Sequence, residues 1–165
     1  MDIYVKFGDV KGDATHASHQ EWIRASSLCW GVEREVSTEI GAPNVRIPSH
    51  PTVSEVTLIK EMDGATASLF REATMGQRGK TCLIDVCSDA QRVYCHFELQ
   101  NALVSSVSLM CQETADGEQA KDVLREEVKI NFTKIIFRYI IENVDDADGD
   151  ASTTMFDYDI ATAKS

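Results

Sequence analysis

The chain lacks the long apolar runs and the catalytic patterns that would assign it to a membrane or to a known reaction. Nowhere do about 18 consecutive apolar residues occur, so we expect no transmembrane helix. The N-terminal MDIYVKFGDV has neither the charged segment nor the apolar stretch of a secretory signal peptide, and we expect synthesis in the cytoplasm. A glycine-rich phosphate loop and a G-x-S-x-G turn are absent too, which argues against an enzyme.

Positive charge is also scarce. The sequence has 16 Lys and Arg against 27 Asp and Glu, which gives a formal net charge of -11. Nucleic acids and anionic membranes attract clustered Lys and Arg, so this balance argues against both as main partners, and we expect no membrane insertion. The five cysteines are an odd number at irregular spacings, which favours free, mostly buried thiols over a disulfide framework: Cys29, Cys82, Cys87, Cys95 and Cys111.

Four residues could suggest a zinc site, but their spacing is wrong. Cys82 and Cys87 are separated by an odd number of residues, and so are Cys95 and His96. In a regular strand each such pair faces opposite sides, whereas zinc needs ligands that converge on one point. We therefore expect no metal site and no cofactor.

An acidic segment near the C-terminus resembles a calcium loop only in its middle. Residues 145–150 read DDADGD, but the first and twelfth positions of such a loop would be Val144 and Met155, where carboxylates are required. We interpret residues 142–154 as a solvated acidic loop.

Two histidines are the remaining candidates for chemistry. His16 and His19 lie in a polar segment, and a catalytic pair would need a nucleophile or carboxylate placed beside it by the fold. Ser105 and Ser106 lie in the middle of a predicted strand rather than on a sharp turn. We therefore predict no catalytic residue.

Alternating apolar residues predict an antiparallel, mainly β protein. Ile3, Val5 and Phe7 alternate with polar neighbours in a first strand, and 165 residues suit a single domain spanning 1–165. One helix is predicted over residues 63–75, with Asp63 as its N-cap and Gly76 as its end, lying outside the sheets. About eight strands and one helix favour a closed or nearly closed barrel. Further strands are predicted at 21–32, 53–60, 82–87, 93–99, 103–109 and 155–160.

The stretch 126–139, EEVKINFTKIIFRY, changes phase in its middle. Val128, Ile130 and Phe132 are apolar at even positions, whereas Ile135 and Phe137 are apolar at odd positions. Side chains alternate between the two faces of a strand, so apolar residues that change from even to odd positions would move to the other face. To keep them on one buried face, the strand needs a bulge or corner, which we predict near residues 133–134.

Residues 33–51 contain all three prolines of the chain and many charges. Prolines exclude a helix or a central strand, so we predict an exposed, extended loop. A connection of this length in a small domain usually has a task, such as binding.

Four stretches occur in an order typical of one family. They are DIYVKFGDVKGDAT with HQEWI and CWG near the N-terminus, VTLIK before the helix, NALVSSVS, and EEVKINF. In these motifs the chain resembles the haemolysin-coregulated protein (Hcp) family, the tube proteins of type VI secretion, over nearly its whole length. The family usually has a glycine-rich loop after its Trp-Gly pair, where this chain has prolines and charges instead.

The resemblance implies a two-sheet antiparallel β-barrel with one flanking α-helix, and no catalytic residue. It also implies a homohexameric ring, and rings stacked into a tube that works with sheath and spike components. Such proteins are made in the bacterial cytoplasm, are exported by type VI secretion without a signal peptide, and in some cases carry or chaperone effector proteins in the lumen.

We expect the extended loop 33–51 to mediate contacts between rings or subunits. Two other functions remain open: a tail-tube protein of a phage-like contractile injection particle, and a monomeric β-barrel that binds a small ligand. The second would require a sizeable internal cavity, and large residues at inward positions argue mildly against it. The candidate contact residues in the loop are Val36, Ile40, Pro43, Val45 and Ile47.

Overall fold

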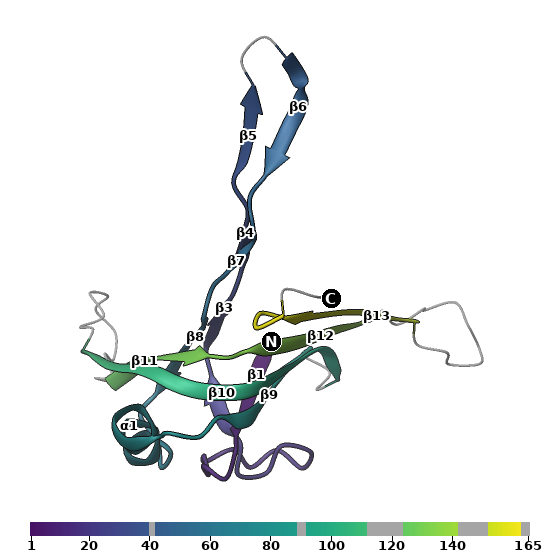
Figure 1. Cartoon of the computed structure of the whole chain (residues 1–165). Coiled ribbons are helices and arrows are strands. Elements are labelled where there is room, and N and C mark those ends of the chain that lie inside the picture. The colour runs from purple at the N-terminus through teal and green to yellow at the C-terminus, as the bar shows by residue number, and fades with distance from the viewer. Residues whose placement is uncertain (40–41, 89–91, 112–123, 142–151, 163–165) are drawn as a thin grey trace, which may run out of the picture.

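The computed structural model describes residues 1–39, 42–88, 92–111, 124–141 and 152–162. Figure 1 shows a body of strands with a helix at its side and a long arm of paired strands that leaves the body. The helix is α1 (Thr66–Met75), and the strands are β1 (Asp2–Phe7), β2 (Ile23–Ala25), β3 (Ser27–Cys29), β4 (Val32–Glu33), β5 (Val36–Glu39), β6 (Ala42–Pro48), β7 (Thr52–Val53), β8 (Val56–Glu61), β9 (Lys80–Cys87), β10 (Val93–Cys111), β11 (Leu124–Asn131), β12 (Lys134–Ile141) and β13 (Ser152–Asp159).

The body is built around β10, which has 19 residues and takes part in two sheets. Its first half pairs with β9 and β12, and its second half pairs with β11. The strand order is β2-β1-β9-β10-β11-β8-β3, with β12 and β13 attached beside β10, and every pair in this order is antiparallel. The two ends of this order, β2 and β3, follow each other in the chain with only Ser26 between them. The expected mainly β, antiparallel class is confirmed, with one helix among the residues that the structure describes.

The corner predicted near residues 133–134 is present at residues 132–133, but it separates two strands rather than bending one. β11 ends at Asn131 and β12 begins at Lys134, and they pair with different halves of β10. Phe132, where the corner begins, and Ile135, after it, are 4% and 0% exposed. The phase change in the sequence therefore keeps the apolar side chains buried on both sides of the corner.

The two strands predicted at 93–99 and 103–109 are instead one, and this correction has a local cause. Asn101 has a φ of 53°, a left-handed conformation that asparagine tolerates better than most residues, so the strand changes direction without ending. Gly79 lies against this bend so closely that a Cβ there would be 1.9 Å from Asn101 Oδ1.

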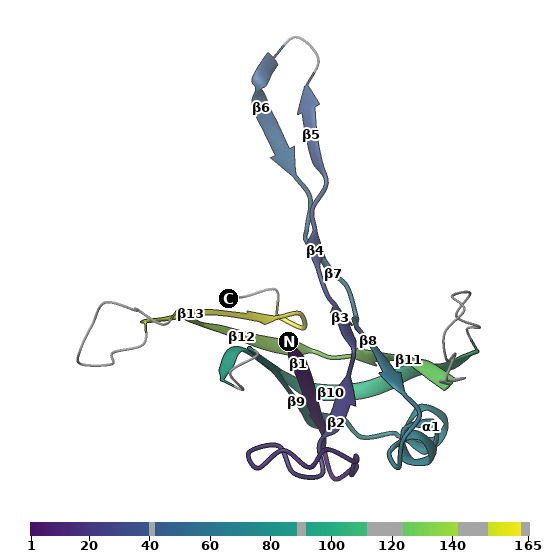
Figure 2. The same ribbon diagram turned by 180° about the vertical axis from the view of Figure 1, so that it is seen from behind.

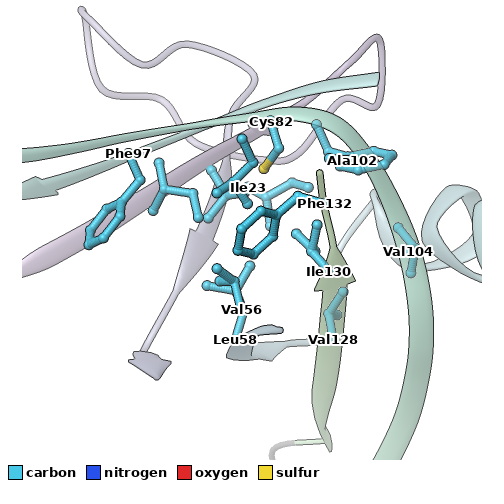
Figure 3. Packing of buried hydrophobic residues seen from close by; sticks show 14 of the residues in the cluster. Ile23, Val56, Leu58, Cys82, Phe97, Ala102, Val104, Val128, Ile130 and Phe132 are labelled. Atoms are coloured by element: carbon cyan, nitrogen blue, oxygen red, sulfur yellow. The ribbon is translucent and has the colours of Figure 1, made fainter. Parts of the chain in front are cut away.

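The core lies between the two halves of the body. Figure 3 shows Val128 and Ile130 of β11 beside Leu58 and Val56 of β8, their register partners in the same sheet, on the face that carries the core. Large side chains fill the inward positions, and Phe7, Ile84 and Leu99 are at most 1% exposed. Burial of such side chains contributes about 25 cal/mol per Å² of apolar surface, the main stabilising term for a body of this kind.

The helix begins later than the sequence predicted. α1 starts at Thr66 with Ala65 at the N-cap, and Ala65 makes no side-chain capping bond. The predicted cap, Asp63, accepts a hydrogen bond from the Ala65 N–H (2.9 Å) and faces the Lys60 ammonium (2.7 Å) instead. The Asp63 side chain is therefore used to bind a buried charge, which the apolar spacing alone could not show.

A buried ion pair joins two strands to the start of the helix. Lys60 of β8 and Glu126 of β11 are 1% and 0% exposed, and Lys60 Nζ lies 2.6 Å from Glu126 Oε1. The Thr66 hydroxyl donates to the same oxygen at 3.2 Å, and Asp63 completes the surroundings of Lys60. Because neither charge can reach water, each depends on the other for its stability.

Replacing Lys60 with methionine is expected to lower the free energy of unfolding by about 3–5 kcal/mol, because the Glu126 carboxylate would stay buried without its partner. The double variant Lys60→Met with Glu126→Leu should recover most of this loss. Urea denaturation measures both effects. Lys129→Met is the matched control, since its pair with Glu127 (3.3 Å) is partly exposed and should contribute less than about 1 kcal/mol. Equal midpoints for Lys60→Met and the control would contradict a supporting role for the pair.

The bend at Asn101 gives a second prediction. Asn101→Gly should leave the thermal midpoint nearly unchanged, because glycine adopts a positive φ without a steric penalty. Asn101→Val should destabilise by about 1–2 kcal/mol, since a β-branched residue is strained there. Circular dichroism melts compare the two variants, and a valine variant as stable as the glycine variant would show that the bend relaxes without cost.

Candidate functional site

The arm is the feature of the molecule that stands furthest from the body. β4 pairs with β7 and β5 pairs with β6, and the resulting ribbon projects away from the sheets in both Figure 1 and Figure 2. The segment 33–51, predicted as an extended loop, is therefore largely a β-ribbon. Its prolines are compatible with this because a ribbon of two strands has only edge strands, where a residue without an N–H is tolerated.

The candidate contact residues lie on this ribbon where they are described. Val36 of β5 is 53% exposed and stands opposite Pro48 of β6 in the register. Pro43, Val45 and Ile47 belong to β6, and Ile47 is the register partner of Ser37. Ile40 lies outside the described residues.

Hydrogen bonds at two levels fix the base of the arm. The Ser54 hydroxyl accepts from the Gly31 N–H (2.9 Å) and donates to the Gly31 carbonyl (3.0 Å). Further out, Arg34 Nε donates to the Ser49 carbonyl at 2.7 Å. The sequence alone did not indicate that Ser54 and Arg34 make these hydrogen bonds across the two strands of the arm.

A second surface is the continuation of the core face onto β12 and β13. Along one row of register partners the side chains run from the interior to the outside: Ile23, Val5, Ile84, Phe97, Phe137 and Phe156. The first four are at most 6% exposed, whereas Phe156 is 40% exposed. Tyr139, on the same face of β12 as Phe137, is 43% exposed. We call Phe137, Tyr139, Phe156 and Tyr158 the aromatic extension.

The aromatic extension lies next to an unpaired strand edge. Within the described part of the chain β13 pairs only with β12, so its outer edge carries backbone groups without a strand partner. Free edges and exposed apolar faces are the places where sheets bind other chains. The sequence predicted a strand at 155–160, but not that its inner face continues the core beyond the body.

The opposite face of the same sheet carries a partly buried cluster of histidines around one carboxylate. His19 Nε2 lies 2.8 Å from Asp85 Oδ2, and His96 Nδ1 lies 2.5 Å from Asp85 Oδ1. His16 and His19 are in contact through their Nδ1 atoms at 3.1 Å. Burial alone would raise the pKa of Asp85, but hydrogen bonds from His96 and His19 outweigh it and hold the pKa below its usual range.

Sequence reasoning did not find this cluster. The carboxylate that it judged necessary beside His16 and His19 comes from β9, 66 residues after His19. The only available signal was a charged residue, Asp85, in the middle of an otherwise apolar strand.

Cys82, Cys87 and Cys95 are free and buried as expected, whereas Cys29 is exposed and the side chain of Cys111 lies outside the description. Cys82 and Cys95 point into the main core, whereas Cys87 and His96 lie on the other face, so they do not converge. Burial raises the pKa of Cys95 to about 11, so this thiol stays protonated at neutral pH. Among the described residues no group of three His, Cys, Asp or Glu side chains is placed to hold a metal ion. The acidic segment 145–150 lies outside the described residues.

A surface hollow of ≈ 540 Å³ beside β2 has a charged lining that includes Asp2, Asp13, Arg24, Glu61 and Asp63. Small-molecule sites are mostly apolar, so this hollow gives no support to a ligand-binding barrel. In the described part of the chain, no helix has the length and apolar character needed to span a bilayer.

Comparisons with known proteins agree with one another. The family model described as "Type VI secretion system effector, Hcp" matches residues 4–139. The chain is 27% identical over 150 residues to Protein hcp1 of Pseudomonas aeruginosa, covering 89% of this chain and 88% of that protein.

Solved structures show the same fold. One described as a type six secretion system protein is 24% identical, with a TM-score of 0.78 over 99% of this chain and 98% of that one. Hcp1 from Salmonella typhimurium is 21% identical, with a TM-score of 0.74 over 99% and 97%. Because the family match spans most of the sequence, the chain belongs to the type VI secretion system effector family Hcp.

Proposed function

We propose that this protein is a tube subunit of a type VI secretion system, in which six copies form a ring and the rings stack into a hollow tube. The observation that carries the proposal is the family match over residues 4–139, which comes with a fold that places an arm and an aromatic face outside a filled core. Family membership supports a structural rather than an enzymatic role. Export without a signal peptide and contacts with sheath, spike and effector proteins belong to the same proposal.

The ring contact would use the aromatic extension. A ring of identical subunits needs two different surfaces that match, because each subunit contacts its neighbours head to tail. The exposed rings of Phe156 and Tyr139 offer apolar area beside the unpaired edge of β13, the combination that lets a second copy pair and pack at once.

The stacking contact would use the arm. Val36 is exposed on β5, far from the core, and the bonds at Gly31–Ser54 and Arg34–Ser49 hold the ribbon in one direction. A preformed arm loses less conformational entropy on binding than a free loop, so it can bind a neighbouring ring or subunit at lower cost.

Deleting the arm tip, residues 41–47, should leave a folded subunit but weaken tubes. Strand β6 pairs with β5 in a two-stranded sheet apart from the sheets of the body, so circular dichroism spectra and melts should match the wild type. Negative-stain electron microscopy and sedimentation should show rings without long stacks. Unchanged tube formation would contradict a stacking role for the arm.

Phe156→Glu should weaken ring formation, because a contact residue of this kind contributes about 2 kcal/mol and a charge would have to be desolvated. The control is Met155→Glu on the same strand, which is 62% exposed and points to the opposite face. Native mass spectrometry at matched concentrations counts the copies in each assembly. If both variants assemble equally well, the aromatic extension is not the ring contact.

A further inference from the structure

The arm joins the body at a break in the strand pairing. On the body side β3 pairs with β8 as far as Cys29 and Thr57, and on the arm side β4 and β7 begin their pairing at Val32 and Val53. Residues 30–31 on one strand and 54–55 on the other lie between the two ladders, and we call these four residues the joint. Because no ladder crosses the joint, the direction of the arm depends on contacts that the joint makes with the sheets.

Trp30 supports the joint on the side of the core. Its ring meets the ring of Phe97 edge-on, with centroids 6.2 Å apart and planes at 74°, and it packs against the main core. Phe97 is buried in the first half of β10, so it gives Trp30 a fixed support. The indole N–H of Trp30 is buried and has no hydrogen-bond partner among the described residues. Packing therefore holds this side chain in place.

Glu55 supports the joint on the side of the solvent. It comes directly before Val56, which is buried, and side chains alternate between the two faces of a strand. The Ser105 hydroxyl donates to Glu55 Oε2 at 3.0 Å, and Asn131 Nδ2 donates to Glu55 Oε1, also at 3.0 Å. One carboxylate thus binds β10 through one oxygen and the end of β11 through the other.

A bulge in β10 provides the serine for this contact. Val104 is the register partner of Ile130, and Ser106 is the partner of Lys129, so Ser105 is an extra residue between two consecutive pairs. A bulge redirects a side chain without ending the strand. The contact with Glu55 gives a role to the Val-Ser-Ser stretch at residues 104–106, which the proposed ring and stacking contacts do not use.

The two supports act on opposite faces of the joint. Bending the arm away from the core would draw Trp30 off Phe97. Bending it toward the core would draw Glu55 away from Ser105 and Asn131, and hydrogen bonds to a charged acceptor are stronger than those between neutral groups. Each contact therefore opposes one of the two bending movements.

We propose that Glu55 and Trp30 are positioning residues that set the direction of the arm, one from each face of the joint. The inference deepens the proposed stacking role and rests on it, since an arm that already points in one direction can meet a neighbouring ring at lower entropic cost. If an unsupported arm takes the stacking direction only about a tenth of the time, the concentration needed for stacking should rise about tenfold. Ring formation should not change.

The direction of the arm can be measured by double electron–electron resonance between one spin label on the arm and one on the body. Arg46→Cys and Met75→Cys supply exposed labelling sites, in a chain where Cys29 and Cys111 are replaced by serine. Labelled chains are diluted into an excess of unlabelled protein, so that only distances within one subunit are read. We expect a narrow distance distribution without further changes and a broad one for Glu55→Ala. Circular dichroism melts check that the body stays folded.

Glu55→Gln separates the hydrogen-bonded bridge from a general effect of substitution. A glutamine amide can accept from Asn131 and donate to the Ser105 hydroxyl, whose own proton can bind the Lys129 carbonyl at 3.2 Å. This variant should therefore stay narrow. The matched control is Glu61→Ala, an exposed glutamate at the other end of β8, which should also stay narrow. A Glu55→Ala distribution as narrow as that of the control, or a Glu55→Gln distribution as broad as that of Glu55→Ala, would overturn the role of Glu55.

Trp30→Leu tests the other face, because leucine keeps an apolar side chain but loses the ring contact with Phe97. The distribution should broaden, and more so when the change is combined with Glu55→Ala. An unchanged distribution for Trp30→Leu would overturn the role of Trp30. Sedimentation of the unlabelled variants tests the link to stacking separately. If Glu55→Ala broadens the distances but forms tubes as the wild type does, the stacking role of the arm is wrong while the positioning role stands.

Discussion

The rest of the body depends on one constraint, the continuity of β10 through two sheets. Because a single strand of 19 residues pairs with β9 and β12 in its first half and with β11 in its second, the two sheets cannot shift relative to each other without breaking one set of pairs. The bend that allows this is concentrated at Asn101, and Gly79 leaves room for it. The corner at residues 132–133 connects β11 and β12, whose positions are set by their pairing with the two parts of β10.

Much of this fold could be predicted from local patterns, and the errors have identifiable causes. Alternation placed the strands and the phase change of residues 128–135, because period-two burial leaves a direct trace in the sequence. It divided β10 wrongly, since an asparagine in a left-handed conformation looks like a turn from sequence alone. The arm was located by its prolines, but its strands were not predicted, because prolines exclude a helix or a central strand but not a ribbon, which has only edge strands.

The candidate surfaces were harder still, because they depend on which strands become neighbours. Phe137 and Phe156 look like ordinary core residues, and only the register shows that the row they extend runs out of the body. Asp85, His19 and His96 meet from three separate segments, so no spacing rule connects them. The family resemblance predicted the fold. It did not predict the contacts of Asp85 with His19 and His96, which come from one loop and two strands.

The arm also has a thermodynamic consequence for assembly. A two-stranded hairpin without a hydrophobic layer is marginally stable by itself in water, so the outer part of this ribbon adds little to the stability of an isolated subunit. If another copy covers the arm, as proposed, the contact would add the stabilisation that the free ribbon lacks, which would link the stability of the arm to growth of the polymer. The Ser54 and Arg34 bonds fix the inner pairs of the ribbon before any such contact forms. A tube made of such parts would lengthen cooperatively and resist the loss of single subunits from its interior.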